Sequence, residues 1–127
     1  TGAITDGETI YAPNMDGNIY ALDTNGNLLW KHHVGGSIVS QPVLVERGLV
    51  VVNKAGELLL LDTEISSQGS SRELSNPIKL DAEVKAALFA EGDSVFVGSQ
   101  DRRVRRVDLK VGETAWCWDT RDGSCNN

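Results

Sequence analysis

The sequence predicts an all-β fold made of about three four-stranded antiparallel units, and three observations support this. A strand that closes with an aspartate recurs three times, ending at Asp23, Asp62 and Asp108. A β-rich segment introduced by a turn precedes each of these strands, and another apolar segment lies upstream of it. The repeat spacing is roughly 40 residues, and four short strands at this period are typical of β-propeller blades.

The most regular unit is the first, over residues 16–30. Period-two alternation places Ile19 and Ala21 on one face of its first strand. Asn25-Gly26 predicts a two-residue hairpin turn, and the returning strand ends at Trp30, whose large ring needs to be buried. Because a lone hairpin is not stable in water, this unit is expected to pack against its neighbours.

Three blades are predicted, at residues 1–33, 38–80 and 84–119, followed by a tail at 120–127 that frays unless the cysteines hold it. The serine-rich stretch 65–75 is expected to be a surface loop that lengthens the second repeat. Propellers close with four to eight blades. Three blades therefore imply a partial propeller, a fragment of a larger one, or several copies that complete one another, and a fragment of a longer chain is favoured.

Composition excludes some classes of protein. A net charge of −6 argues against nucleic-acid binding, which favours a basic surface. No apolar run reaches the roughly 18 residues of a membrane span. Cys117 and Cys125 lie near the C-terminus, either as free thiols or as a disulfide that closes a short loop in an oxidising compartment. Their spacing is not that of a zinc site with further ligands.

The pattern Asp-Gly-x-Ile-Tyr-Ala-Leu-Asp-x-x-Gly-x-Leu-Leu-Trp at 16–30 resembles the blade repeat of the PQQ-like (quinoprotein-type) β-propeller family, which includes quinoprotein alcohol dehydrogenases and BamB-like lipoproteins. The resemblance weakens in the second unit, which has Gly69 at the tryptophan register. The third unit keeps Trp116 but has Asp101-Arg102 in place of Asp-Gly. The resemblance implies that Trp30 and Trp116 are structural and pack between neighbouring blades.

The repeated aspartates are interpreted as structural residues. A catalytic carboxylate is needed once, whereas Asp23, Asp62 and Asp108 recur in every unit, as expected of side chains that bind the backbone of the following turn. The stretch that begins at Asp23 lacks the glycine and glutamate positions of an EF-hand calcium loop. His32 and His33 are adjacent on a strand, point to opposite faces and cannot share a metal ion. No catalytic, cofactor-binding or metal-binding residue is predicted.

One strand of this acidic protein is unusually rich in arginine: the four residues are Arg102, Arg103, Arg105 and Arg106. By register, Arg106 takes the place of Ala21 and Arg105 that of Tyr20. The strand could meet an acidic partner surface, because guanidinium groups pair well with carboxylates. Alternatively, the arginines pair internally with Asp101, Asp108 or Glu113, or reach solvent along their apolar stems. The internal or solvated interpretation is favoured.

The leading functional hypothesis is a non-catalytic propeller segment that binds or scaffolds a protein partner, or docks on the remaining propeller blades. A periplasmic or extracellular/luminal location is expected. The alternative is a fragment of a PQQ-dependent quinoprotein dehydrogenase, which by resemblance would hold the quinone and a calcium ion, although this chain lacks the adjacent cysteine pair of the alcohol dehydrogenases. A ligand-sensing luminal or extracellular propeller is a third hypothesis. The prediction is thus no enzyme and no cofactor, with oligomerisation left open.

Overall fold

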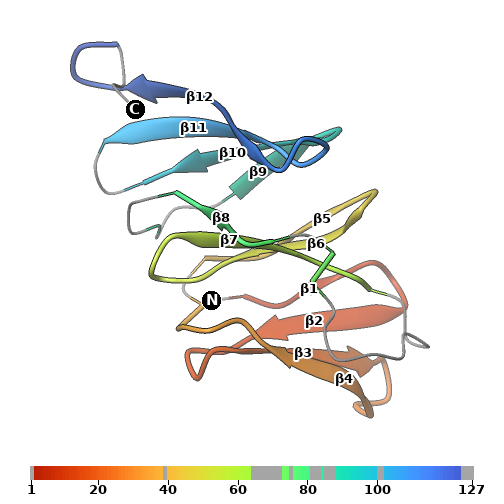
Figure 1. The fold of residues 1–127 in the computed structure, drawn as a ribbon. Coiled ribbons are helices and arrows are strands. Elements are labelled where there is room, and N and C mark those ends of the chain that lie inside the picture. The colour runs from red at the N-terminus through yellow and green to blue at the C-terminus, as the bar shows by residue number, and fades with distance from the viewer. Residues whose placement is uncertain are drawn as a thin grey trace.

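The computed structural model describes residues 2–38, 40–63, 73–74, 76–80, 84, 88–99 and 102–123. These residues form three four-stranded sheets and contain no helix (Figure 1). Within each sheet, every strand pairs antiparallel with the next strand in the chain, so each sheet is a simple meander. The predicted fold class, all-β with four-stranded antiparallel units, is confirmed.

The first sheet contains β1 (Ile4–Thr5), β2 (Thr9–Pro13), β3 (Asn18–Asp23) and β4 (Leu28–His33). The second contains β5 (Val43–Val45), β6 (Gly48–Val52), β7 (Glu57–Leu61) and β8 (Ile78–Lys79). The third contains β9 (Leu88–Glu91), β10 (Ser94–Gly98), β11 (Arg103–Asp108) and β12 (Glu113–Asp119).

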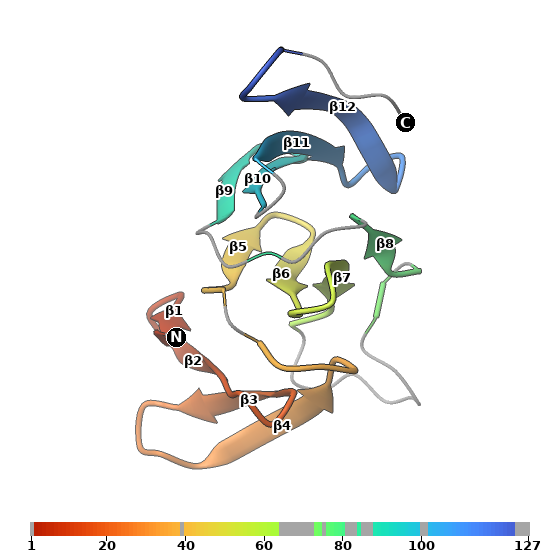
Figure 2. The same cartoon turned by 90° about the vertical axis from the view of Figure 1, so that its left-hand side faces the viewer.

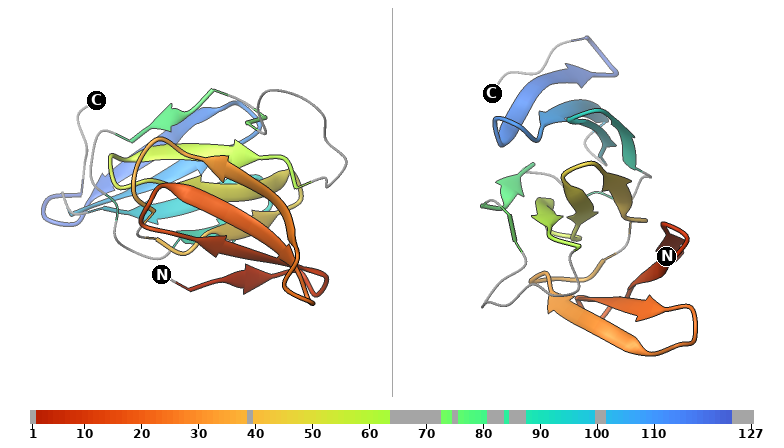
Figure 3. Two further views of the ribbon diagram at one scale, coloured as in Figure 1. Left: turned by 90° about the horizontal axis from the view of Figure 1, so that it is seen from below. Right: turned by 90° about the vertical axis from the view of Figure 1, so that its right-hand side faces the viewer.

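The sheets are stacked in chain order, with the second between the first and the third (Figures 1 and 2). The first strand of each sheet, β1, β5 or β9, lies along one side of the stack, and β5 contacts β9 there. Figure 3 shows the same stack from below and from the opposite side. One face of the first sheet and one face of the third sheet lie at the two ends of the stack.

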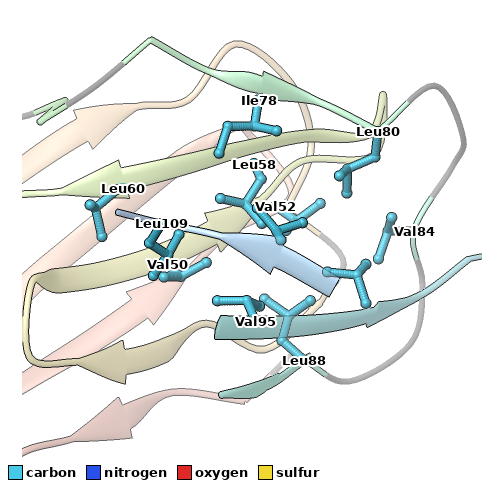
Figure 4. Packing of buried hydrophobic residues seen from close by; sticks show 12 residues of the cluster. Val50, Val52, Leu58, Leu60, Ile78, Leu80, Val84, Leu88, Val95 and Leu109 are labelled. Carbon is cyan, nitrogen blue, oxygen red and sulfur yellow. The ribbon is translucent and has the colours of Figure 1, made fainter. Parts of the chain in front are cut away.

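Two hydrophobic cores join the sheets. Because neighbouring residues on a strand point to opposite faces, Leu49 and Leu61 face the first sheet, whereas Val50 and Leu60 face the third. Figure 4 shows the second core, where Val95 and Leu88 of the third sheet meet the aliphatic face of the second. Burying each such side chain contributes about 1.5–3 kcal/mol, which explains why β6 and β7 are almost wholly apolar.

The predicted two-residue turn between β3 and β4 is wrong. Four residues, 24–27, connect Asp23 to Leu28. The carboxylate of Asp23 accepts hydrogen bonds from backbone N–H groups of this loop and so stabilises the four-residue connection over a two-residue one. A β-bulge between Ala21 and Leu22 then restores the register of the two strands. The positive φ of 88° at Gly26 agrees with the expectation that glycine is needed there.

Two further expectations concern loops. Of the serine-rich stretch 65–75, only Glu73 and Leu74 are described, so the predicted surface loop otherwise lies outside the described residues. In the tail, the N–H of Thr120 donates to the carbonyl of Arg102 at 2.8 Å, and the N–H of Gly123 donates to that of Asp119 at 2.7 Å. Residues 120–123 are therefore hydrogen-bonded to the third sheet, while 124–127 lie outside the described residues.

Candidate binding surface

The aspartates that close the repeated strands bind their own turns. Asp23 Oδ1 accepts the backbone N–H groups of Asn25 at 2.9 Å and Asn27 at 2.8 Å. In the third sheet, Asp108 Oδ1 accepts those of Lys110 at 2.9 Å and Val111 at 3.2 Å. The hydrogen bond from the Asn27 backbone is the largest cause that lowers the pKa of Asp23.

Asp62 follows β7, and residues 64–72 lie outside the described residues, so the role of Asp62 in a turn stays a prediction. Asp23 and Asp108 therefore each bind the backbone of their own turn, and their carboxylates do not converge on one site.

Asp119 is an important carboxylate that the sequence analysis did not single out. It lies at the end of β12 and is buried. Its Oδ2 is 2.8 Å from Nη2 of Arg121, and its Oδ1 is 3.0 Å from Nε of the same residue. The side-chain hydrogen bond from Arg121 is the largest cause that holds the pKa of Asp119 well below its usual range, followed by the hydrogen bond from the Arg121 backbone. The sequence signal for this ion pair is an aspartate that lies two residues before an arginine and next to a turn.

The two repeat tryptophans have different surroundings. Trp30 is 7% exposed and lies in the core between the first and second sheets, with its ring centroid 5.9 Å from that of Tyr11. Trp116 is 42% exposed and lies on the outer face of the third sheet, 6.1 Å from Phe96. The side chain of Trp30 is therefore buried between the first and second sheets. Beyond the face that carries Trp116, the described part of the chain contains no further sheet.

The four arginines do not share one face. Arg103 and Arg105 point to the face of β11 opposite Arg106, because strand residues alternate, and Arg102 precedes β11 instead of lying on it. Arg105 is 7% exposed, with its Nη1 2.6 Å from Ser99 Oγ. A single basic strand face is therefore absent from the described residues.

Arg103 has an internal partner that was not among the expected carboxylates: its Nε lies 3.5 Å from Oδ2 of Asp119. Asp101 lies outside the described residues, so the predicted pairing with Asp101, Asp108 or Glu113 stays a prediction. On the other face, Nε of Arg106 donates to Ser94 Oγ at 2.8 Å. Arg103 and Arg106 therefore both contact polar side chains of the third sheet itself.

Arg102 has φ of 65°, and no other described residue except glycine has a positive φ. Its N–H donates to the carbonyl of Ser99 at 3.2 Å, just as those of Gly17 and Gly56 donate to Asn14 and Asn53 at 3.1 and 3.0 Å. Arg102 therefore adopts the left-handed backbone of the turn that the other repeats form with Asp-Gly or Ala-Gly, although glycine tolerates this conformation best.

The histidines are separately engaged. His32 Nε2 lies 3.2 Å from Glu73 Oε2, and His33 Nδ1 lies 3.2 Å from Asn18 Oδ1. Among the residues that the structure describes, no group of three or more histidine, cysteine, aspartate or glutamate side chains could hold a metal ion. Nor is any helix there long and apolar enough to cross a membrane.

Cys117 of β12 carries a disulfide bond. Cys125 lies outside the described residues, so the predicted pairing of these two cysteines stays a prediction. A disulfide fits an oxidising compartment.

A groove of about 430 Å³ runs beside the first strands of the three sheets. Its lining is mainly apolar, from Ile4, Leu44 and Leu88, with Gln41 and Thr5 as polar groups. β1, β5 and β9 are edge strands in their own sheets. Edge strands present unpaired backbone N–H and C=O groups, so this side offers both apolar contact and main-chain hydrogen bonds to an extended segment.

Comparisons with known proteins agree with this architecture. The sequence profile of the family described as outer membrane protein assembly factor BamB matches residues 1–69 and 16–127. A protein of that name from Burkholderia pseudomallei is 28% identical over 117 residues, which is 91% of this chain and 30% of the relative. The chain thus spans about a third of the length of that relative.

Solved structures give the same result. The crystal structure of BamB from Moraxella catarrhalis superposes with a TM-score of 0.74 at 25% identity, over 91% of this chain and 34% of that one. The computationally designed protein Ika8 superposes with a TM-score of 0.76 at 20% identity, over 96% of this chain and 37% of that one. The second likeness shows the fold alone.

Proposed function

Because this chain belongs to the BamB family of PQQ-like β-propeller proteins, we propose that it is a non-catalytic, protein-binding module of the assembly-factor type. The Burkholderia pseudomallei relative, which is 28% identical, carries the name outer membrane protein assembly factor BamB. The proposal extends to a periplasmic location, which the disulfide at Cys117 supports, because disulfides persist in oxidising compartments.

The groove beside β1, β5 and β9 is the observation that carries this proposal. It combines apolar side chains with the free edges of three neighbouring strands. An extended segment of a partner protein could pair with such an edge through its backbone and place alternate side chains in the groove. The carboxylates of Asp23 and Asp108, in contrast, bind the backbone of their own turns.

A retention experiment tests the proposal. The chain is immobilised and exposed to solubilised envelope proteins of Moraxella catarrhalis, and retained proteins are quantified by mass spectrometry. Gln41→Arg places a charged, bulky side chain at the groove, and Asn76→Arg makes a related change at an exposed position outside it. Loss of a specific retained protein with Gln41→Arg but not with Asn76→Arg is expected. Equal retention by both variants contradicts the groove as binding surface, and no specific retention contradicts protein binding.

The arginines are tested as partner-binding residues in the same assay. Single alanine variants of Arg102, Arg103, Arg105 and Arg106 are compared with Lys54→Ala, an exposed lysine in the turn between β6 and β7. Weaker retention with Arg102→Ala or Arg106→Ala, but not with Lys54→Ala, is expected if guanidinium groups bind the partner. Unchanged retention removes the arginines from the proposed surface.

The non-catalytic part of the proposal is tested with PQQ and calcium. Both are added to the chain, and absorbance of the quinone and reduction of an electron-accepting dye in the presence of primary alcohols are recorded. We expect no spectral change and no turnover. Turnover would establish the dehydrogenase alternative and overturn the proposal.

A further inference from the structure

The loop between β3 and β4 contains an asparagine that is followed directly by a glycine, Asn25-Gly26. This pair occurs once in the sequence. Asparagine is a chemically labile residue, because the backbone nitrogen of the next residue can attack its side-chain amide. The two groups belong to one chain, so the reaction is intramolecular and its rate depends on how closely they approach. Glycine permits the closest approach, since it has no Cβ and adopts backbone conformations that other residues avoid.

The side chain of Asn25 is exposed, and no hydrogen-bond partner for it is found in the described part of the chain. The other described asparagines that precede a residue with a backbone N–H all have side-chain partners: Asn14, Asn18, Asn27 and Asn53. A bonded amide must break its hydrogen bond and leave its rotamer before its Cγ atom can be attacked. Asn25 can therefore reach the reactive geometry without losing a side-chain contact.

The surroundings of Gly26 leave room for a cyclic intermediate. Nothing lies within 4 Å of the position that a Cβ of Gly26 would occupy, and residues 24–28 are all exposed. Water can therefore reach a ring that forms between Asn25 and Gly26. Asn76 provides an internal contrast, because it is also exposed but precedes Pro77, which has no N–H to react.

We propose that Asn25 is a site of spontaneous deamidation, which converts it to a mixture of aspartate and isoaspartate. The Gly26 nitrogen bonds to Cγ of Asn25, the Cγ–Nδ2 bond breaks, and ammonia leaves with the proton of the Gly26 N–H. Water then opens the cyclic imide. Attack of water at Cγ gives aspartate, whereas attack at the main-chain carbonyl carbon of residue 25 gives isoaspartate, whose backbone runs through the side chain. This goes beyond the proposed function, since it involves no partner protein.

The turn formed by Asp23 slows this reaction. The N–H of Gly26 donates to the carbonyl of Asp23 at 3.0 Å, so the attacking nitrogen is engaged in the folded loop. The carboxylate of Asp23 accepts the N–H groups of Asn25 and Asn27 at 2.9 and 2.8 Å and holds the loop in one conformation. Its negative charge also opposes loss of the proton from the nearby Gly26 nitrogen. Deamidation in the folded chain should therefore be slower than in the unfolded chain.

The products change the same turn. Both add one negative charge beside Asp23, in a chain whose net charge is already −6. Isoaspartate also inserts one additional backbone atom between residues 25 and 26, which moves the Gly26 N–H away from the carbonyl of Asp23. The isoaspartate form should therefore unfold at lower urea than the Asn25→Asp variant, which carries the added charge on an unchanged backbone.

Peptide mapping by mass spectrometry tests the proposal. The folded chain is incubated in mildly alkaline buffer, and a sample unfolded in guanidinium chloride gives the unprotected rate. Fragmentation should locate the mass change from amide to acid at Asn25, in two products of equal mass. Protein isoaspartate methyltransferase should label one of these products. Asn76 should stay unchanged in the same samples, because Pro77 cannot attack it.

Matched variants test the control by the turn. Asp23→Ala should accelerate the conversion of Asn25 several-fold, because it removes the carboxylate that holds the loop. Asp108→Ala removes the equivalent carboxylate from the loop between β11 and β12 and should leave the rate unchanged. Circular dichroism of both variants confirms that the fold is kept.

Two results overturn the proposal. One is an unchanged Asn25 in the folded chain over the time in which the unfolded chain converts. The other is conversion at Asn14 or Asn27 as fast as at Asn25, since their side chains are hydrogen-bonded. Equal rates in Asp23→Ala and Asp108→Ala contradict the control by the turn. These readouts require no partner, so they are independent of the proposed function.

Discussion

Replacing Arg102 by glycine is expected to stabilise this protein, although the change removes a whole side chain. Arg102 has φ of 65° and the same backbone hydrogen bond as Gly17 and Gly56, whose φ is 89°. A left-handed backbone costs a residue with a Cβ about 1–2 kcal/mol. Glycine loses more conformational freedom on folding, which costs about 0.5–1 kcal/mol. The difference predicts a net gain of about 0.5–1 kcal/mol in the free energy of unfolding.

Two further variants separate the backbone from the side chain. Arg102→Ala keeps the left-handed strain and removes the same guanidinium, so its stability should stay close to that of the parent. Gly26→Ala is the reverse change in the first sheet: φ is 88° and nothing lies within 4 Å of the added Cβ, so only the backbone cost is introduced. We expect it to destabilise the protein by about 1 kcal/mol.

The measurement is urea unfolding followed by tryptophan fluorescence, with stability compared through midpoints at constant m value. Arg102→Gly should unfold at higher urea than both the parent and Arg102→Ala. Arg102→Gly at or below the stability of Arg102→Ala would refute the reasoning, because the two variants differ mainly in the backbone freedom of residue 102.

The remaining predictions concern packing and pH. Trp30→Ala should lower the free energy of unfolding by about 3–5 kcal/mol, because it empties a core position between two sheets. Trp116→Ala should lower it by less than about 1 kcal/mol, because Trp116 is already exposed. Equal losses of stability in urea unfolding would contradict the different surroundings of the two tryptophans. The pKa of Asp119 is held below its ordinary value of 3.8, so its stabilisation is fully present above that pH and is lost as the pH falls through the native pKa. Asp119→Asn should therefore flatten the acid limb of thermal stability between about pH 4 and pH 2, and an unchanged slope would show that Arg121 does not stabilise this carboxylate.

The strands could be predicted because their signals are local. Alternation along β3, the continuous apolar runs of β6 and β7, and the turn residues between them are all properties of short segments. The partner of Arg103 is not a local property. Asp119 is placed beside it by the register of β11 against β12, which shifts at a bulge between Arg106 and Val107. A bulge adds one residue to one strand, and nothing in this sequence indicates where that residue is added.

The same limit applies to the length of the first hairpin. Asn25-Gly26 favours a two-residue turn in isolation, but Asp23 has its carboxylate within reach of two loop amides and stabilises a four-residue loop instead. The dipeptide identifies the turn, whereas the hydrogen bonds of the preceding side chain decide its size. The aspartate and the glycine therefore have to be considered together before strand bounds are assigned.

Trp30 and Trp116 show what a repeat alone leaves undecided. They occupy the same register, yet one is 7% and the other 42% exposed, and the difference comes from the sheet that covers Trp30. The sequence of a blade determines on which face of its sheet each side chain lies. Whether that face is core or surface depends on whether a neighbouring sheet covers it. The third sheet has its aliphatic face buried and its aromatic face open, so it lacks part of the apolar burial that stabilises the second. Any sheet that binds the open face stabilises the third sheet by mass action, and the stability of the whole chain should then rise with the concentration of that partner.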